Sequence, residues 1–289
     1  MAFYFAQLLT GLANAAALFL VASGLSIIFG VTRVVNFSHG SFYMLGAYIG
    51  YTAMNVMPGI FGFWTSILFA GIAVGLIGVV VEIFVLKPIY KAPELFQLVA
   101  TFGVILVIQD LALLIWGPED LFGQRAPGFT GIVRIFGEPV PTYDLVLIAL
   151  SLVVLFALWF LFSKTRMGVL VRAATQDREM VSALGVNQAV LFSGVFFLGA
   201  FLAGIGGAAQ LPKGSANLLM DFGILAPIFV VVVTGGMGFI GSAVVKKLLK
   251  LKYKVINIDK LTYASNLEKI KEFKSYKNHF FYKNDIINQ

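Results

Sequence analysis

The sequence predicts an all-α polytopic membrane protein with about seven transmembrane helices, followed by a short C-terminal α/β fragment, part of a Rossmann fold. Three observations support this prediction. Hydrophobic residues make up 59% of the 289 residues and charged residues only 12%, whereas soluble domains contain about 25% charged residues. The apolar residues stand in seven long runs. The excess of positive charge lies entirely after the last of these runs.

Charge divides the chain into two parts. Residues 1–233 contain ten Lys/Arg and ten Asp/Glu, whereas residues 234–289 contain eleven Lys/Arg and four Asp/Glu, which is the whole net charge of +7. We therefore expect a transmembrane domain over 1–233 and an incomplete dinucleotide-binding fragment over 234–289.

The seven apolar runs are the candidate membrane spans, because a helix needs about 20 mostly apolar residues to cross the hydrocarbon core. They are residues 5–30, 36–57, 60–86, 95–117, 143–163, 189–211 and 218–236. The first run has no basic residues before it and is too long for a signal-peptide core. We expect it to be the first span.

The basic residues between the runs predict the orientation. They fall in alternate connections, at Arg33, at Lys87 and Lys91, and in the connection that begins at Lys164. Cytoplasmic connections carry an excess of Lys and Arg. We therefore expect the N-terminus outside, the C-terminal tail in the cytoplasm, and the connection 118–142 in the periplasm.

Small residues recur at four-residue spacing in these runs. Such spacing lets helix backbones approach closely in lipid, and it predicts helix–helix contacts. The positions are Gly46 and Gly50, Gly71 and Gly75, and Gly199, Ala203 and Gly207.

Polar residues within the apolar runs are candidates for a substrate path, because polar groups at membrane depth are costly unless they are satisfied or face a cavity. The first group is Asn36, Ser38, His39 and Gly40, and the second is Asp110, beside Gln109. Two interpretations stay open for each: the first group forms an interfacial turn or a broken helix, and Asp110 forms a helix–helix hydrogen bond or binds substrate.

The connection 163–187 has the pattern of short amphipathic helices at the membrane face. Such helices bind lipid headgroups or a partner protein. Acidic and basic residues alternate at Arg172, Asp177 and Arg178, which favours a protein-docking surface over a patch for anionic lipid.

The chain offers little to metal or redox chemistry. It has no cysteine, and its two histidines, His39 and His279, lie in different parts. Disulfides and thiolate zinc sites are therefore excluded, and we expect no metal site and no catalytic residues. The phosphate loop G-x-x-x-x-G-K-[ST] is also missing.

Three motifs in this order, NFSHGSFYMLGAY, RAATQDREMVSALGVN and VVVVTGGMG, resemble the membrane-spanning permease subunits of branched-chain amino-acid ABC importers, over about residues 1–238. The resemblance implies a transporter of the bacterial inner membrane and not an enzyme. Its implied partners are a second permease subunit, cytoplasmic ATP-binding subunits that hydrolyse ATP, a periplasmic substrate-binding protein and membrane lipid, but no nucleic acid. The residues implied to couple to the ATPase are Arg172, Asp177, Arg178, Ala183 and Gly185.

The tail carries a second pattern. Glycines at 236, 238 and 241 match G-x-G-x-x-G after a β-branched run, and a helix and a second strand, Lys254–Ile258, follow before Asp259. This is the order of a dinucleotide-binding half. VTGGMGFIGSAVV, NIDKLTYASNLE and NDI at 284–286 resemble the N-terminus of extended short-chain dehydrogenases, most closely dTDP-glucose 4,6-dehydratase. The residues implied to contact NAD are Gly235, Gly238, Gly241, Asp259 and Asp285.

The two resemblances share the string VTGGMG, so we interpret the chain as a chimera joined within Thr234–Gly241. We expect Ile228–Val233 to stay helical, which leaves the glycine turn without its strand, and we expect no cofactor unless the tail folds around NAD. The alternative is a nucleotide-sugar dehydratase fused to a membrane anchor. It requires a Tyr-x-x-x-Lys pair, which none of the tyrosines at 253, 263, 276 and 282 supplies.

Overall fold

The computed structural model divides into two compact units, Met1–Ile228 and Phe229–Gln289, which are described separately. The structure describes residues 2–32, 34–90, 92–176, 181, 185–233, 249, 255–259, 273, 276 and 279–283.

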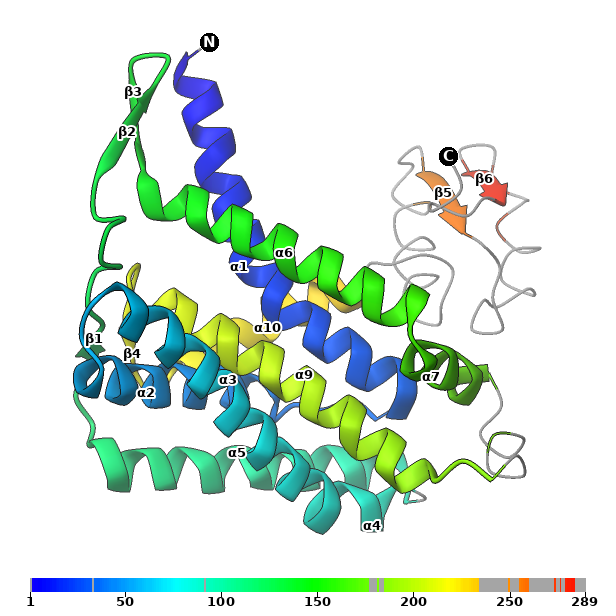
Figure 1. The fold of residues 1–289 in the computed structure, drawn as a ribbon. Helices are drawn as coiled ribbons and strands as arrows, with labels where there is room; N and C mark the ends of the chain where they lie inside the picture. Colours follow the sequence, from blue (N-terminus) through cyan, green and yellow to red (C-terminus); the bar gives the residue numbers. More distant parts are fainter. Residues whose placement is uncertain are drawn as a thin grey trace. The chain divides into compact units, whose positions relative to one another are not determined.

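The first unit is a bundle of apolar helices (Figure 1). Its long helices are α1 (Ala2–Thr32), α2 (His39–Val56), α3 (Ile60–Val81), α5 (Glu94–Trp116), α6 (Thr142–Lys164) and α9 (Gln188–Gln210). The shorter ones are the π-helical turn η1 (Glu82–Leu86) and α4 (Lys87–Ile89), which continue α3, then α7 (Arg166–Gln176), and α10 (Met220–Val233), which begins in this unit.

Among the described residues each of the seven expected runs contains a helix, and five of these helices are long and apolar enough to cross a membrane. These are Ala2–Thr32, Ile60–Ile89, Leu95–Trp116, Thr142–Lys164 and Gln188–Gln210. The other two, α2 and α10, do not reach this threshold. In α2 the reason is its polar residues, such as His39, Ser41 and Asn55; thirteen of its 18 residues are buried, and a helix surrounded by protein does not need a lipid-compatible surface. In α10 it is length, since only 14 of its residues are described.

The centre of the bundle is α9, which packs against α1, α2 and α3. Backbones meet there without side chains between them: Gly24 faces Gly199, and Gly46 faces Gly204. A Cβ at Gly50 would lie 2.7 Å from that of Ala208, closer than real Cβ contacts. The prediction that the spaced glycines form helix contacts is confirmed.

One end of the bundle carries short strands in the connection 118–142, which the sequence predicted only as a loop. β2 (Ile132–Ile135) and β3 (Glu138–Pro141) form an antiparallel hairpin, whereas β1 (Leu121–Phe122) pairs with β4 (Ser215–Ala216). Both turn residues of the hairpin, Phe136 and Gly137, have positive φ, at 53° and 90°, as a tight two-residue hairpin turn requires. We call this the hairpin end.

The second unit contains two parallel strands, β5 (Val255–Asp259) and β6 (His279–Lys283), with Val255 opposite His279. The predicted strand at 254–258 is confirmed with a shift of one residue. Parallel strands need a crossover connection, so this pair is a fragment of the expected α/β type. Residues 228–233 belong to α10, which confirms that the run before the glycine turn is helical.

Candidate substrate path and coupling surface

The second helix begins deep inside the bundle. His39, its first residue, donates from Nε2 to the carbonyl oxygen of Val21 at 3.0 Å. Val21 lies eleven residues before the end of α1, which is about 16 Å along the helix axis. Residues 34–38 therefore run back alongside α1, and the broken-helix interpretation of this segment describes its geometry better than an interfacial turn.

The start of α10 meets the start of α2 at this level. A Cβ on Gly40 would run into the carbonyl oxygen of Asp221 and come within 3.0 Å of Leu225. Gly40 is therefore needed for the close approach of two helix N-termini. Irregular backbone at membrane depth is tolerated where protein surrounds it or where it lines a cavity.

A buried carboxylate joins the elements that meet here. Asp221 is 1% exposed and accepts hydrogen bonds from Gln109 Nε2 at 3.0 Å and from Ser41 Oγ at 3.3 Å. Its own helix contributes the backbone N–H of Phe222 at 2.7 Å. Asp221 thus ties α10 to α5 and α2.

Asp221 was missed by the sequence prediction, and Asp110 was proposed instead. Asp110 is exposed on α5, and its side chain forms no hydrogen bond or ion pair with any described residue. Its neighbour Gln109 faces inward. The signal that could have found Asp221 is the one used for Asp110, an acid inside an apolar run.

The predicted polar group between the first two spans is buried. Asn36, Ser38 and His39 are all 0% exposed, and Asn36 Oδ1 accepts from the backbone N–H and the hydroxyl of Ser38 at 3.0 and 2.6 Å. Asn36 Nδ2 and His39 Nδ1 have no hydrogen-bond partner among the described residues. Buried polar atoms without partners are uncommon. Four of the five predicted path residues, Asn36 and Ser38–Gly40, thus lie together in the interior, and Asp110 lies apart from them.

A line of polar and aromatic side chains leads from Asp221 toward the hairpin end. Tyr48 is stacked on Trp116 with ring centroids 5.1 Å apart, and the indole N–H of Trp116 donates to Thr52 Oγ1 at 2.7 Å. Ser41, Tyr48 and Thr52 recur at helical spacing on one face of α2. We name Ser41, Tyr48, Thr52, Gln109, Trp116 and Asp221 the polar seam.

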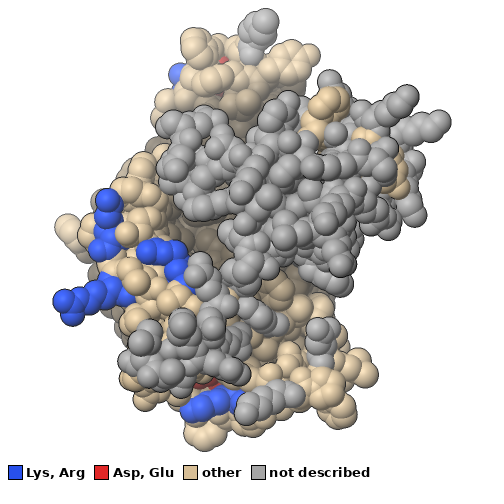
Figure 2. All heavy atoms as spheres, turned by 90° about the vertical axis from the view of Figure 1, so that its right-hand side faces the viewer, with Lys and Arg blue, Asp and Glu red and all other residues tan. Residues whose placement is uncertain are grey.

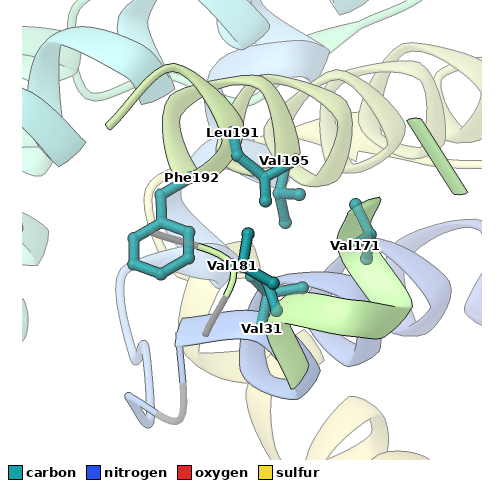
Figure 3. Close-up of a cluster of buried hydrophobic side chains, with 7 residues drawn as sticks. Val31, Val171, Val181, Leu191, Phe192 and Val195 are labelled. Carbon is teal, nitrogen blue, oxygen red and sulfur yellow. The ribbon is translucent and has the colours of Figure 1, made fainter. Parts of the chain in front are cut away.

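The predicted amphipathic connection forms α7 at the opposite end of the bundle. Its apolar face packs into a buried cluster with the last turn of α1 and the first turns of α9 (Figure 3). The cluster consists of Val31, Val171, Ala174, Val181, Leu191, Phe192 and Val195. This packing fixes α7 against α1 and α9.

The exposed face of α7 and its surroundings are basic among the described residues. Lys164, Arg166 and Arg172 are exposed, and Figure 2 shows Lys and Arg side chains grouped on this side. Arg172 also donates to the carbonyl oxygen of Phe162. Gly185 has φ +81°, which an L side chain rarely adopts.

Several predicted site residues lie outside the described residues. They are Asp177, Arg178 and Ala183 of the coupling connection, and Gly235, Gly238, Gly241 and Asp285 of the NAD pattern. Asp259 is the last residue of β5.

Comparison with known proteins finds two families in this chain. The family model described as "Branched-chain amino acid transport system / permease component" matches residues 7–258, and that of the NAD dependent epimerase/dehydratase family matches residues 231–289. The first match extends past the limit of about residue 238 inferred from the motifs, and the two overlap around the expected junction. Two families on one chain are consistent with a chimera.

Relatives divide in the same way. The high-affinity branched-chain amino acid transport system permease protein BraD of Pseudomonas aeruginosa is 29% identical over 261 residues, 85% of this chain and 83% of that protein. LivH of Escherichia coli K12, a permease protein of the same description, is 26% identical over 266 residues, 86% of this chain and 83% of its own. A probable dTDP-glucose 4,6-dehydratase of Sinorhizobium fredii is 48% identical over 56 residues, 19% of this chain and 16% of that protein.

No solved structure matches the chain. The family match nevertheless covers most of its length and agrees with the apolar helix bundle. This multi-pass membrane protein therefore belongs to the permease components of branched-chain amino acid transport systems.

Proposed function

We propose that this chain is a membrane-spanning permease subunit of an ABC importer that carries leucine, isoleucine and valine across the bacterial inner membrane. The match to the permease family over residues 7–258 is the observation that supports this function. The relatives named as branched-chain amino acid permeases cover similar shares of this chain and of their own length.

In this proposal ATP is hydrolysed on separate cytoplasmic subunits, and α7 docks one of them. The packing of α7 supports this role. Its apolar residues Val171 and Ala174 are buried against α1 and α9, whereas Arg166 and Arg172 are exposed and can meet an acidic surface. A second permease subunit and a periplasmic binding protein complete the importer.

The orientation follows from the same charges. We place the α7 end in the cytoplasm, where Lys87, Lys164 and Arg166 are exposed, in line with the positive-inside rule. The hairpin end and the start of α1 then lie in the periplasm. There the charge of Lys213 is paired with Asp144 at 2.9 Å.

The tail has no enzymatic role in this proposal. The chain spans 16% of the dehydratase that it matches, and Ile228 to Val233, the run needed as the first strand, is helical. We propose that no working NAD site forms and that transport requires no cofactor bound to this chain.

Uptake measurements test the function directly. Proteoliposomes that contain this chain, its partner subunits and the binding protein should accumulate labelled leucine, isoleucine and valine when ATP is supplied. Urea and short amides serve as comparison substrates. Uptake of urea without uptake of leucine would reject the proposed substrate class while leaving a permease role.

A further inference from the structure

Asp221 is a buried acid with no cationic partner among the described residues. Among the described residues the only ion pair joins Lys213 to Asp144, so no Lys or Arg that the structure describes lies within ion-pair distance of Asp221. An ionisable residue inside a membrane bundle is costly and commonly functional. The charge of this carboxylate therefore has to be stabilised by other means.

Hydrogen-bond donors stabilise the carboxylate without neutralising it. Gln109 donates to both of its oxygens, at 3.2 and 3.0 Å, and Ser41 and the backbone N–H of Phe222 complete the set. Each of these donors is uncharged, so ionised Asp221 keeps its full negative charge at the point where two helices begin. The N-termini of α2 and α10 add only partial positive charges, so the full charge of the carboxylate still attracts a cation.

The surroundings add features that suit an organic cation. The Tyr48 hydroxyl is buried and has no hydrogen-bond partner among the described residues. Tyr48 lies seven residues after Ser41, on the same face of α2. Its ring and that of Trp116, stacked 5.1 Å apart, offer π faces that attract ammonium groups.

We infer that the polar seam is a binding site for the α-ammonium group of the transported amino acid, with Asp221 as its counter-ion and with Ser41 and Tyr48 as hydrogen-bonding partners. This inference rests on the proposed transport function, since it assigns the substrate group that the path recognises. It also replaces Asp110 by Asp221 as the acid of the path.

The test uses ligands that separate the two charged groups of leucine. Isoamylamine keeps the side chain and the ammonium group, whereas 4-methylpentanoate keeps the side chain and the carboxylate. The assembled importer, in nanodiscs and without its binding protein, is titrated with each ligand while its Tm is recorded. A ligand that binds only the folded state raises the Tm in proportion to its occupancy.

We expect isoamylamine and leucine to raise the Tm of the wild-type importer and 4-methylpentanoate to leave it unchanged. Asp221→Asn, which keeps the shape and removes the charge, should weaken isoamylamine binding about tenfold or more. Asp221→Glu should restore most of it. Asp110→Asn is the matched control, because it removes an exposed acid one residue from Gln109, and it should bind as the wild type does.

Equal Tm shifts by isoamylamine and 4-methylpentanoate, or no shift by isoamylamine, would overturn the inference, and this wild-type comparison holds even where the Asn variant does not fold. Unchanged isoamylamine binding by a folded Asp221→Asn importer would overturn it as well. The transport function fails separately, through loss of leucine uptake by the wild-type importer.

Discussion

The carboxylate of Glu82 accepts a 2.6 Å hydrogen bond from the hydroxyl of Ser193, 111 residues later in the chain. Glu82 is fully buried and starts the π-helical turn η1. Its other oxygen accepts from the Tyr90 hydroxyl at 2.9 Å. This contact joins the end of α3 to the beginning of α9, beside the cluster that holds α7.

Ser193→Ala should therefore destabilise the bundle. It leaves a buried carboxylate oxygen without its donor, which costs about 1–3 kcal/mol, and the Tm of the purified chain should fall. Thr65→Ala is the control, because the Thr65 hydroxyl is exposed and donates only to carbonyls of its own helix. Equal Tm values for the two variants would contradict the role given to Glu82.

Gly46→Ala should disturb the packing of α2 on α9. The added Cβ would meet the backbone of Gly204, and overpacking of this kind costs about 1–3 kcal/mol. Gly11→Ala is the matched control, since nothing beyond its own helix backbone and chain neighbours lies within 4 Å of a Cβ there, and alanine favours the helix. Thermal unfolding in detergent should therefore separate the two alanine variants, with the lower Tm for position 46.

A double change in the coupling connection, Arg172→Ala with Asp177→Ala, should abolish most leucine uptake. The physical reason is loss of the charges expected to meet the ATP-binding subunit, while the apolar cluster under α7 stays intact. Co-purification of that subunit and uptake by proteoliposomes measure the two effects. Arg134→Ala in β2, at the hairpin end, is the control, and wild-type transport by the double variant would refute the coupling role.

Single introduced cysteines should report the orientation, because the chain has no native cysteine. Arg125→Cys, in the connection that bears the hairpin, should react with a membrane-impermeant reagent added outside the cell membrane. Val169→Cys, exposed on α7, should react only after the membrane is permeabilised and the reagent reaches its cytoplasmic side. Labelling of position 125 from the cytoplasmic side alone would contradict the proposed orientation.

NAD should not bind to the tail. The strand that would precede the glycine turn is replaced by the helical run that ends at Val233, so the pyrophosphate lacks its usual strand–turn–helix frame. Titration of the purified chain with NAD, followed by calorimetry, should show no heat of binding. Micromolar binding would restore the alternative of an anchored dehydratase fragment.

The sequence by itself determined which segments are helical and that spaced small residues form contacts between helices. Each depends on local chemistry. An apolar run of about 20 residues becomes a helix in lipid because its backbone N–H and C=O groups can hydrogen-bond only to one another there. Small residues four apart form a smooth helix face. The basic connection that became α7 was predicted for a similar reason, from apolar residues at helical spacing. The change of family near Val233 also appears in the residues alone.

Tertiary structure alone decided which polar residues meet. Gln109 and Asp110 are neighbours in sequence, and successive residues on a helix point about 100° apart, so only the packing of α5 shows that Gln109 faces inward and Asp110 outward. The partner of Gln109 is Asp221, 112 residues away. They meet because α2 and α10 both begin inside the bundle, and the close approach of their N-termini depends on Gly40, where any side chain would collide with the backbone of Asp221.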